Sequence, residues 1–128
     1  MVERKRGEQA LRGIVEGYLS REHRDSPGQG CIIAALGTSI ARQPHSVREV
    51  VTKELKGVFE FLAQLMPEDA SPRHHDDAIV AFASMVGALI LARAVNDESL
   101  SDRILRATTK RVTQRTKVRG PARRTRGN

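Results

Sequence analysis

Residues 78–92 read AIVAFASMVGALILA, a run of fifteen residues without a charged side chain. A helix that is apolar on every side must be covered on more than one side. A membrane-spanning helix needs about 20 such residues, whereas Arg93 ends this run early, and Ser84 and Gly87 interrupt it. The run therefore predicts a helix over residues 77–96 that is buried in protein.

This helix carries two kinds of side chain. The bulky set consists of Ile79, Phe82, Val86, Leu89 and Ile90. The small set recurs at the spacing of one helical face, where another helix can approach closely, and consists of Ala81, Ser84, Ala88 and Ala92. A chain of 128 residues has few other elements to cover every side, so a second copy would supply the missing cover. The alternative is the central helix of a monomeric bundle.

The composition indicates which residues form the core and in which cellular compartment the protein lies. Apolar residues make up 39% of the chain and aromatic residues only 3%, so the core must consist of Leu, Ile, Val and Ala. The single Cys31 excludes an internal disulfide and a zinc cluster of cysteines, and it is compatible with a reducing compartment. The charged start of the chain is followed by Gly7 and polar residues, not by the apolar segment of a signal peptide. We therefore expect a cytoplasmic protein.

The net charge of +7 is unevenly distributed. Residues 103–128 carry ten Lys or Arg and no acidic residue, whereas residues 1–102 carry 12 basic and 15 acidic residues. Ten cations attract phosphate without reading its sequence. A small basic protein that binds nucleic acid non-specifically through this tail is therefore the alternative function. No aromatic residue lies among these cations for base stacking, which favours a solvated tail.

Four further stretches show helical periodicity, separated by Pro- and Gly-containing segments. They predict helices over residues 8–22, 31–42, 46–66 and 99–115. Ser46-x-x-Glu49 matches the capping box that starts a helix, and Ser99-x-x-Asp102 resembles it.

No stretch shows the alternation of a half-buried strand, so the predicted fold class is all-α with about five helices. The domain is expected over residues 8–116. Residues 1–7 would precede it as a remnant or linker, and residues 117–128 would follow it as a basic, disordered tail.

Two segments resemble the regulatory domain of TetR/AcrR-type transcriptional regulators. Residues 18–31 read YLSREHRDSPGQGC, which is similar to a turn in one branch of that family, where a Pro-Gly-x-Gly-Cys segment opens a small apolar helix. Residues 84–95 read SMVGALILARAV and, with LSDRIL at 100–105, resemble the last two helices of the same branch. The resemblance extends over about residues 8–113.

This resemblance implies a dimer and a ligand pocket. In such regulators the last two helices pack against those of a second subunit as a four-helix bundle, and the preceding helices enclose a small, often apolar effector. The predicted dimer-interface residues are Ala81, Ser84, Ala88, Ala92, Leu100, Ile104 and Leu105. The predicted ligand-binding residues, which lie on inward helical stripes, are Tyr18, Phe59, Leu62, Phe82, Met85 and Leu89. Tyr18 is favoured because a buried hydroxyl needs a partner, and ordinary core is the alternative for each residue.

The same regulators read DNA with an N-terminal helix-turn-helix, for which residues 1–7 leave no room before the first predicted helix. We therefore expect the effector-binding and dimerisation domain of a ligand-responsive repressor, truncated relative to the family and without its own DNA-reading head. The expected partners are a small apolar or aromatic effector and either a second copy or a full-length relative. Neither specific DNA binding nor a membrane is expected.

No residue pattern predicts catalysis, a metal or a cofactor. His74-His75-Asp76-Asp77 contains metal-ligand residue types, but adjacent residues rarely converge on one ion, and acidic residues at a helix start are explained by capping and the helix dipole. Cys31 has no patterned His and acid partner, so a small core residue is favoured over a redox sensor or nucleophile. An enzyme is the least favoured class.

Overall fold

The computed structural model describes residues 2–66 and 73–115, and all of its regular elements are helices. They are α1 (Val2–Tyr18), α2 (Arg21–Asp25), the 3-10 helix η1 (Pro27–Gln29), α3 (Ile32–Ile40), α4 (His45–Leu65), α5 (Arg73–Ala94) and α6 (Glu98–Arg115). The all-α prediction is therefore confirmed for the described residues. The five predicted helices correspond to α1, α3, α4, α5 and α6, and the short α2 and η1 occupy the segment predicted to be a loop.

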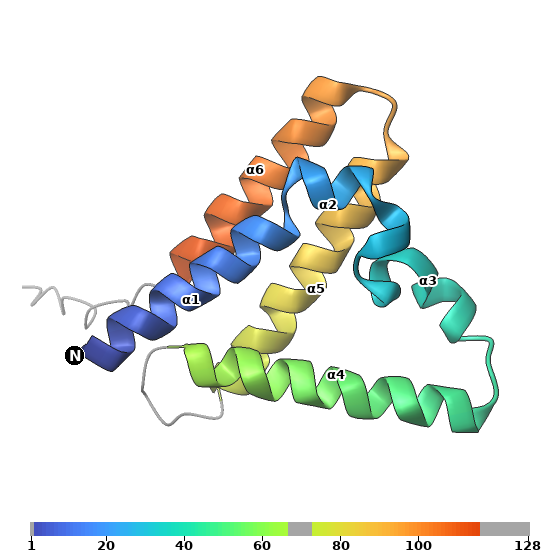
Figure 1. Cartoon of the computed structure of the whole chain (residues 1–128), viewed down its shortest axis with the longest axis horizontal. Coiled ribbons are helices and arrows are strands. Elements are labelled where there is room, and N and C mark those ends of the chain that lie inside the picture. Colours follow the sequence, from blue (N-terminus) through green and yellow to red (C-terminus); the bar gives the residue numbers. More distant parts are fainter. Residues whose placement is uncertain (1, 67–72, 116–128) are drawn as a thin grey trace, which may run out of the picture.

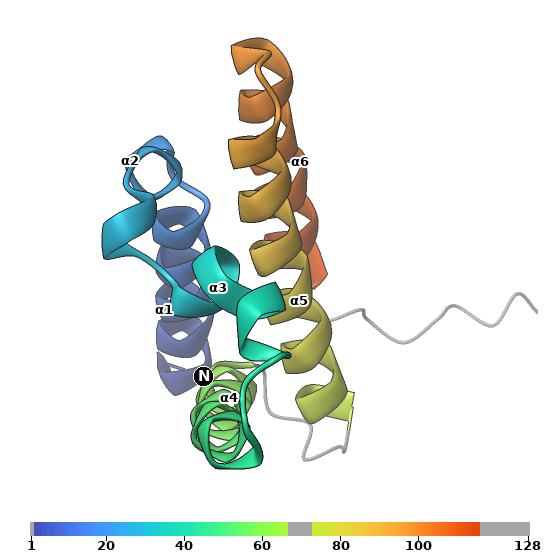
Figure 2. The same cartoon turned by 90° about the vertical axis from the view of Figure 1, so that its right-hand side faces the viewer.

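Helix α5 contacts α2, α3, α4 and α6. Figures 1 and 2 show α5 and α6 side by side as an antiparallel hairpin, with α1 packed along α6 and α4 crossing the ends of α1 and α5. The core lies where these four helices meet, and its buried apolar residues are Leu11, Val15, Leu19, Leu62, Ala63, Met66, Ala78, Ala81, Met85, Ala88, Ala92, Leu105 and Val112. Burial of a large apolar side chain stabilises the fold by about 1.5–3 kcal/mol. The contacts of α4 with α1 and α5 therefore hold these three helices together, and the remaining elements pack against them.

Helix α1 begins at Val2, before the predicted start at Glu8, so residues 2–7 are helical instead of a linker. Gly7 explains how this extra turn is accommodated. A Cβ atom at Gly7 would lie 2.9 Å from the carbonyl oxygen of Leu65, and real Cβ atoms do not approach a backbone oxygen so closely. The missing side chain thus lets the first turns of α1 pass directly over the last turn of α4.

The capping motifs predict helix starts at Ser46 and Ser99, and both helices begin one residue earlier. Helix α4 begins at His45, after Pro44, and has no side-chain cap. Helix α6 begins at Glu98, and the carboxylate of Asp97 accepts a hydrogen bond of 3.0 Å from the backbone N–H of Leu100. Asp97 thereby satisfies one of the N–H groups that a helix leaves unpaired at its first turn.

Helix α5 has two opposite apolar faces. The inward face is buried in the chain's own core and consists of Ala78, Ala81, Met85, Ala88, Leu89 and Ala92. The outward face is exposed and consists of Ile79, Val80, Ala83, Ile90 and Leu91. At 100° per residue the two sets lie on opposite sides of the helix. The chain's own helices therefore cover only one side of α5.

By length and composition alone, residues 75–94 of α5 could cross a membrane. The central helix of a water-soluble protein passes the same test, so this property is weak evidence for a membrane.

Candidate functional site

An aromatic cluster lies at the end of α1. Tyr18, the last residue of α1, makes edge-to-face contacts with the imidazole of His23 at a centroid distance of 4.7 Å and with the ring of Phe82 at 6.1 Å. Phe82 of α5 in turn contacts Phe59 of α4 edge to face at 5.9 Å. Such pairs contribute about 0.5–1.5 kcal/mol beyond the area that they bury. The cluster therefore joins three predicted ligand-binding residues from three helices.

The hydroxyl of Tyr18 is the one polar feature of this cluster that lacks an ordinary partner. Its oxygen is buried, and no group in the described part of the chain forms a hydrogen bond of standard geometry with it. Burial raises the pKa of the Tyr18 hydroxyl, and the neighbouring thiol of Cys31 raises this pKa further. An unpaired buried hydroxyl costs about 1–3 kcal/mol. The hydroxyl therefore has no hydrogen bond of standard geometry within the described residues, although the thiol of Cys31 and the guanidinium of Arg93 lie near enough to affect its pKa.

His23 fixes the turn beside Tyr18 with both of its ring nitrogens. Nδ1 lies 2.7 Å from the carbonyl oxygen of Tyr18, and Nε2 lies 3.0 Å from the backbone N of Cys31. A carbonyl can only accept and a backbone N–H can only donate, so this arrangement requires a neutral imidazole with its proton on Nδ1. A Cβ atom at Gly30 would collide with this ring, which explains the glycine. The sequence analysis missed His23, since a lone His in a turn carries no periodic signal.

The other predicted ligand-binding residues are core residues. Leu62, Met85 and Leu89 are buried, and Leu62 and Met85 belong to the main apolar core with Phe82 packed against it. The structure therefore brings Tyr18 and Phe82 together with these residues as closely packed side chains.

The predicted dimer-interface residues divide between the core and the surface. Ala81, Ala88, Ala92 and Leu105 are buried within the single chain, Ser84 and Ile104 are half-buried, and Leu100 is exposed. A partner helix cannot reach the four buried residues unless the chain's own helices separate. The face of α5 that is open to a partner is the outward face defined above.

A polar cluster, which the sequence analysis also missed, ties α2 to the α5–α6 hairpin. The guanidinium of Arg24 donates to the carboxylate of Asp102 at 2.8 Å and to the hydroxyl of Ser101 at 3.1 Å. Arg21 donates to the second oxygen of the same carboxylate at 2.7 Å. The side chains of Arg24 and Asp102 are only 10% and 15% exposed, so this ion pair is better shielded from water than a typical surface pair.

Arg93, the first charged residue after the apolar run, forms hydrogen bonds to the backbone in the last turn of α2. Its guanidinium donates to the carbonyl oxygens of His23 at 2.7 Å and Arg24 at 3.0 Å. These carbonyls lie in the last turn of a short helix, where backbone acceptors lack partners within the helix. Ser101 adds a buried hydrogen bond of 2.7 Å to the carbonyl of Ala92. A charge that ends an apolar run is the signal that could have identified Arg93.

The acid stability of the chain should depend on this polar cluster. Hydrogen bonding to Arg24 holds the pKa of Asp102 below its ordinary value. A carboxyl with a lowered folded pKa stabilises the fold above its unfolded pKa of about 3.9, and this stabilisation is lost as the pH falls through the folded value. We expect Asp102→Asn to be less stable than the parent at neutral pH and to lose less stability on acidification. Urea unfolding at about pH 7, 5 and 3 measures both effects.

The matched control is Glu60→Gln, which neutralises an exposed carboxylate of α4. It should follow the parent at each pH. Equal pH dependence of the parent and Asp102→Asn would contradict a stabilising role for the Arg24–Asp102 pair.

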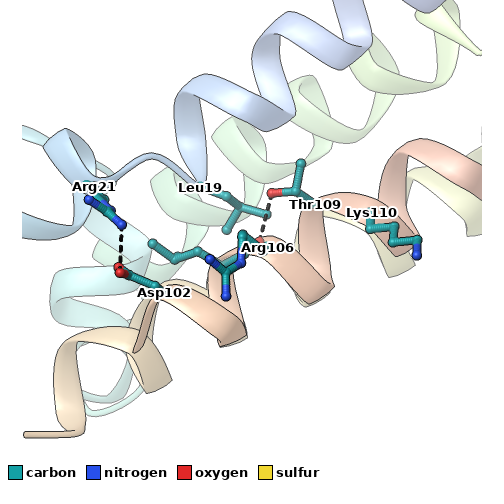
Figure 3. Close-up of a pocket in the computed structure, with 7 residues that line it drawn as sticks. Leu19, Arg21, Asp102, Arg106, Thr109 and Lys110 are labelled. Atoms are coloured by element: carbon teal, nitrogen blue, oxygen red, sulfur yellow. Dashed lines mark hydrogen bonds and ion pairs between the residues drawn. The ribbon is translucent and has the colours of Figure 1, made fainter. Parts of the chain in front are cut away.

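A pocket of about 320 Å³ lies between the α1–α2 junction and α6, and its lining includes no aromatic residue. Its lining residues are Leu19, Arg21, Asp102, Leu105, Arg106, Thr109 and Lys110, and Figure 3 shows most of them. Among the described residues, no three His, Cys, Asp or Glu side chains lie close enough together to hold a metal ion. The basic tail at 117–128 lies outside the described residues.

No protein-family model matches the chain, and no curated protein matches it. The fold and the geometry of its sites therefore carry the functional argument.

Proposed function

We propose that the chain is the effector-binding and dimerisation domain of a TetR-like, ligand-responsive repressor, without catalytic activity of its own. The observation that carries this proposal is the buried, unpartnered hydroxyl of Tyr18, the residue for which the sequence predicts a ligand contact. Ligand sites are mostly apolar and use a few polar groups to orient the ligand. The aromatic cluster with one unpaired hydroxyl has this composition.

The effector that fits this cluster is a small aromatic or apolar molecule with one neutral hydrogen-bonding group. The rings of Phe59 and Phe82 would contact its apolar part, and the hydroxyl of Tyr18 would bond its polar group. Because the cluster is closely packed, the effector would enter by separating α4 from α1 and α5. The first six residues of α4 support this route, since residues 45–50 are all exposed.

The proposed dimer uses the outward face of α5. Its exposed apolar residues and Leu100 of α6 lie on the helical hairpin that resembles the family's dimerisation helices. Twofold pairing of two such hairpins makes a four-helix bundle, and a stable interface of this kind buries at least ~1,000 Å² in total. Regulation of DNA binding would then pass through this dimer to a DNA-reading head outside these residues.

Tyr18→Phe tests the effector site. Removal of an unpaired buried hydroxyl should leave the melting temperature of the ligand-free protein unchanged or raise it, because the desolvation cost disappears. A ligand that binds only the native state raises the melting temperature by a free energy of RT ln(1 + [L]/Kd). In a panel of small phenols, ketones and lactones, we expect shifts in the parent that fall in Tyr18→Phe, with affinity lower by roughly fivefold to tenfold.

Phe82→Leu should also reduce these ligand-induced shifts, because Phe82 lies inside the cluster. Phe61→Leu is its matched control, since Phe61 is exposed on α4, and it should bind as the parent does. A panel without any shift in the parent, or equal binding by Tyr18→Phe, would place the effector elsewhere or exclude it.

A further inference from the structure

We propose that the groove between the α1–α2 junction and α6 is a second ligand site, which takes a small organic anion with an apolar body. This groove is the pocket of about 320 Å³ described above. It is independent of the proposed effector site, because its lining includes none of the aromatic residues Tyr18, Phe59 and Phe82.

The floor of the groove is apolar. Leu19, which lies between α1 and α2, and Leu105 of α6 line it, and both are buried. The hydroxyl of Thr109 donates to the carbonyl of Leu105 at 2.8 Å, so this hydroxyl is already used and its methyl group remains as a lining surface. Figure 3 shows Leu19 lying over α6, with Thr109 along the same helix. The floor would therefore bind an apolar body and would give it no polar contact.

The rim of the groove is cationic. Arg21, Arg106 and Lys110 line it, and Asp102 is the single acidic residue of the lining. Asp102 is engaged by Arg21 at one end, as Figure 3 shows. Within the described part of the chain, neither Arg106 nor Lys110 has an ion-pair partner. Arg106 and Lys110 are one helical turn apart on α6, so both cations lie along the same part of the groove.

The size and charge of the groove select the class of ligand. Its volume lies at the lower end of the range of about 300–1,000 Å³ for small-molecule pockets, which suits a molecule with one ring or a short alkyl chain. Two cations without partners favour a carboxylate or a similar anionic group at the edge of an apolar floor. An inorganic anion would leave the floor unused, and a neutral molecule would leave the cations unused.

A nuclear magnetic resonance titration of the whole chain with benzoate tests the site. We expect the backbone amides of Leu105 and Thr109 to shift and to saturate. Arg106→Gln and Lys110→Gln should each weaken benzoate binding by roughly fivefold, since each removes one partly exposed cation. Acetate, which lacks the ring, and benzamide, which lacks the charge, should both bind more weakly than benzoate.

Arg103→Gln is the matched control, because Arg103 is exposed on α6 and does not line the groove. It should leave benzoate binding unchanged. Three results would overturn the proposal. The first is a loss of benzoate affinity in Arg103→Gln as large as in Arg106→Gln, which indicates diffuse charge attraction. The second is binding of acetate or benzamide as tight as that of benzoate, and the third is a set of shifts centred on the amides of Phe59 and Phe82. Saturating shifts at the groove that depend on Arg106 and Lys110 would support it.

Discussion

Ala88→Glu is expected to abolish the cooperative folding of the chain. Ala88 is only 4% exposed and packs in the core of the single chain. A carboxylate at this position would be buried without a partner, at a cost of several kcal/mol. This cost is comparable to the whole stability of a typical domain, about 5–15 kcal/mol. Far-UV circular dichroism during thermal melting should show lost or non-cooperative helix.

Ala83→Glu is the control for this result. It places the same side chain on the same helix, five residues away, on the outward face, where Ala83 is exposed. The variant should retain its helical content and melt cooperatively. If Ala88→Glu melts as the parent does, the small-residue face of α5 does not lie in the core of the single chain.

The second large effect is expected at the outward face of α5. Leu91 is 56% exposed, so glutamate there is compatible with the folded single chain. In the proposed dimer the same carboxylate would be buried beside its symmetry mate, where desolvation and like charge both oppose it. We expect the parent to sediment at twice the chain mass of 14.2 kDa. Leu91→Glu should sediment as a folded monomer, with dimer affinity lower by more than about tenfold.

Val50→Glu is the matched control for dimerisation, since Val50 is a comparably exposed apolar residue on α4. It should sediment as the parent does. A parent that is a folded monomer at micromolar concentration would remove the proposed interface, and dissociation by Val50→Glu alone would move it from α5 to α4.

Local sequence patterns were sufficient to predict the five long helices. The stripe in residues 46–66 repeats at helical spacing and forms α4, whereas α5 is predicted from the unbroken apolar run at 78–92. The capping motif of α6 failed because the carboxylate of Asp97 caps this helix instead, and Asp102 pairs with Arg24 across the chain. The motif of α4 failed because this helix begins after Pro44 without a side-chain cap. An ion pair between residues 78 positions apart cannot be predicted from a local sequence pattern.

Periodicity also could not identify which neighbour covers a helical face. The spacing of Ala81, Ala88 and Ala92 predicts a close approach by another helix, and any helix of either copy would satisfy it. In the structure the chain's own helices cover these residues. For Tyr18 the prediction rested on the need of a buried hydroxyl for a partner, and in the structure this hydroxyl has no hydrogen bond of standard geometry within the described residues. A ligand contact at Tyr18 stays a prediction.

Tyr18 also belongs to a continuous chain of contacts that leads away from the aromatic cluster. Its carbonyl is bound by Nδ1 of His23, and the carbonyl of His23 is bound by the guanidinium of Arg93 at the far end of α5. Hydrogen bonds weaken steeply when their length or angle changes. A continuous series of hydrogen bonds therefore links the last turn of α1 through α2 to the end of α5, close to the turn that joins α5 to α6.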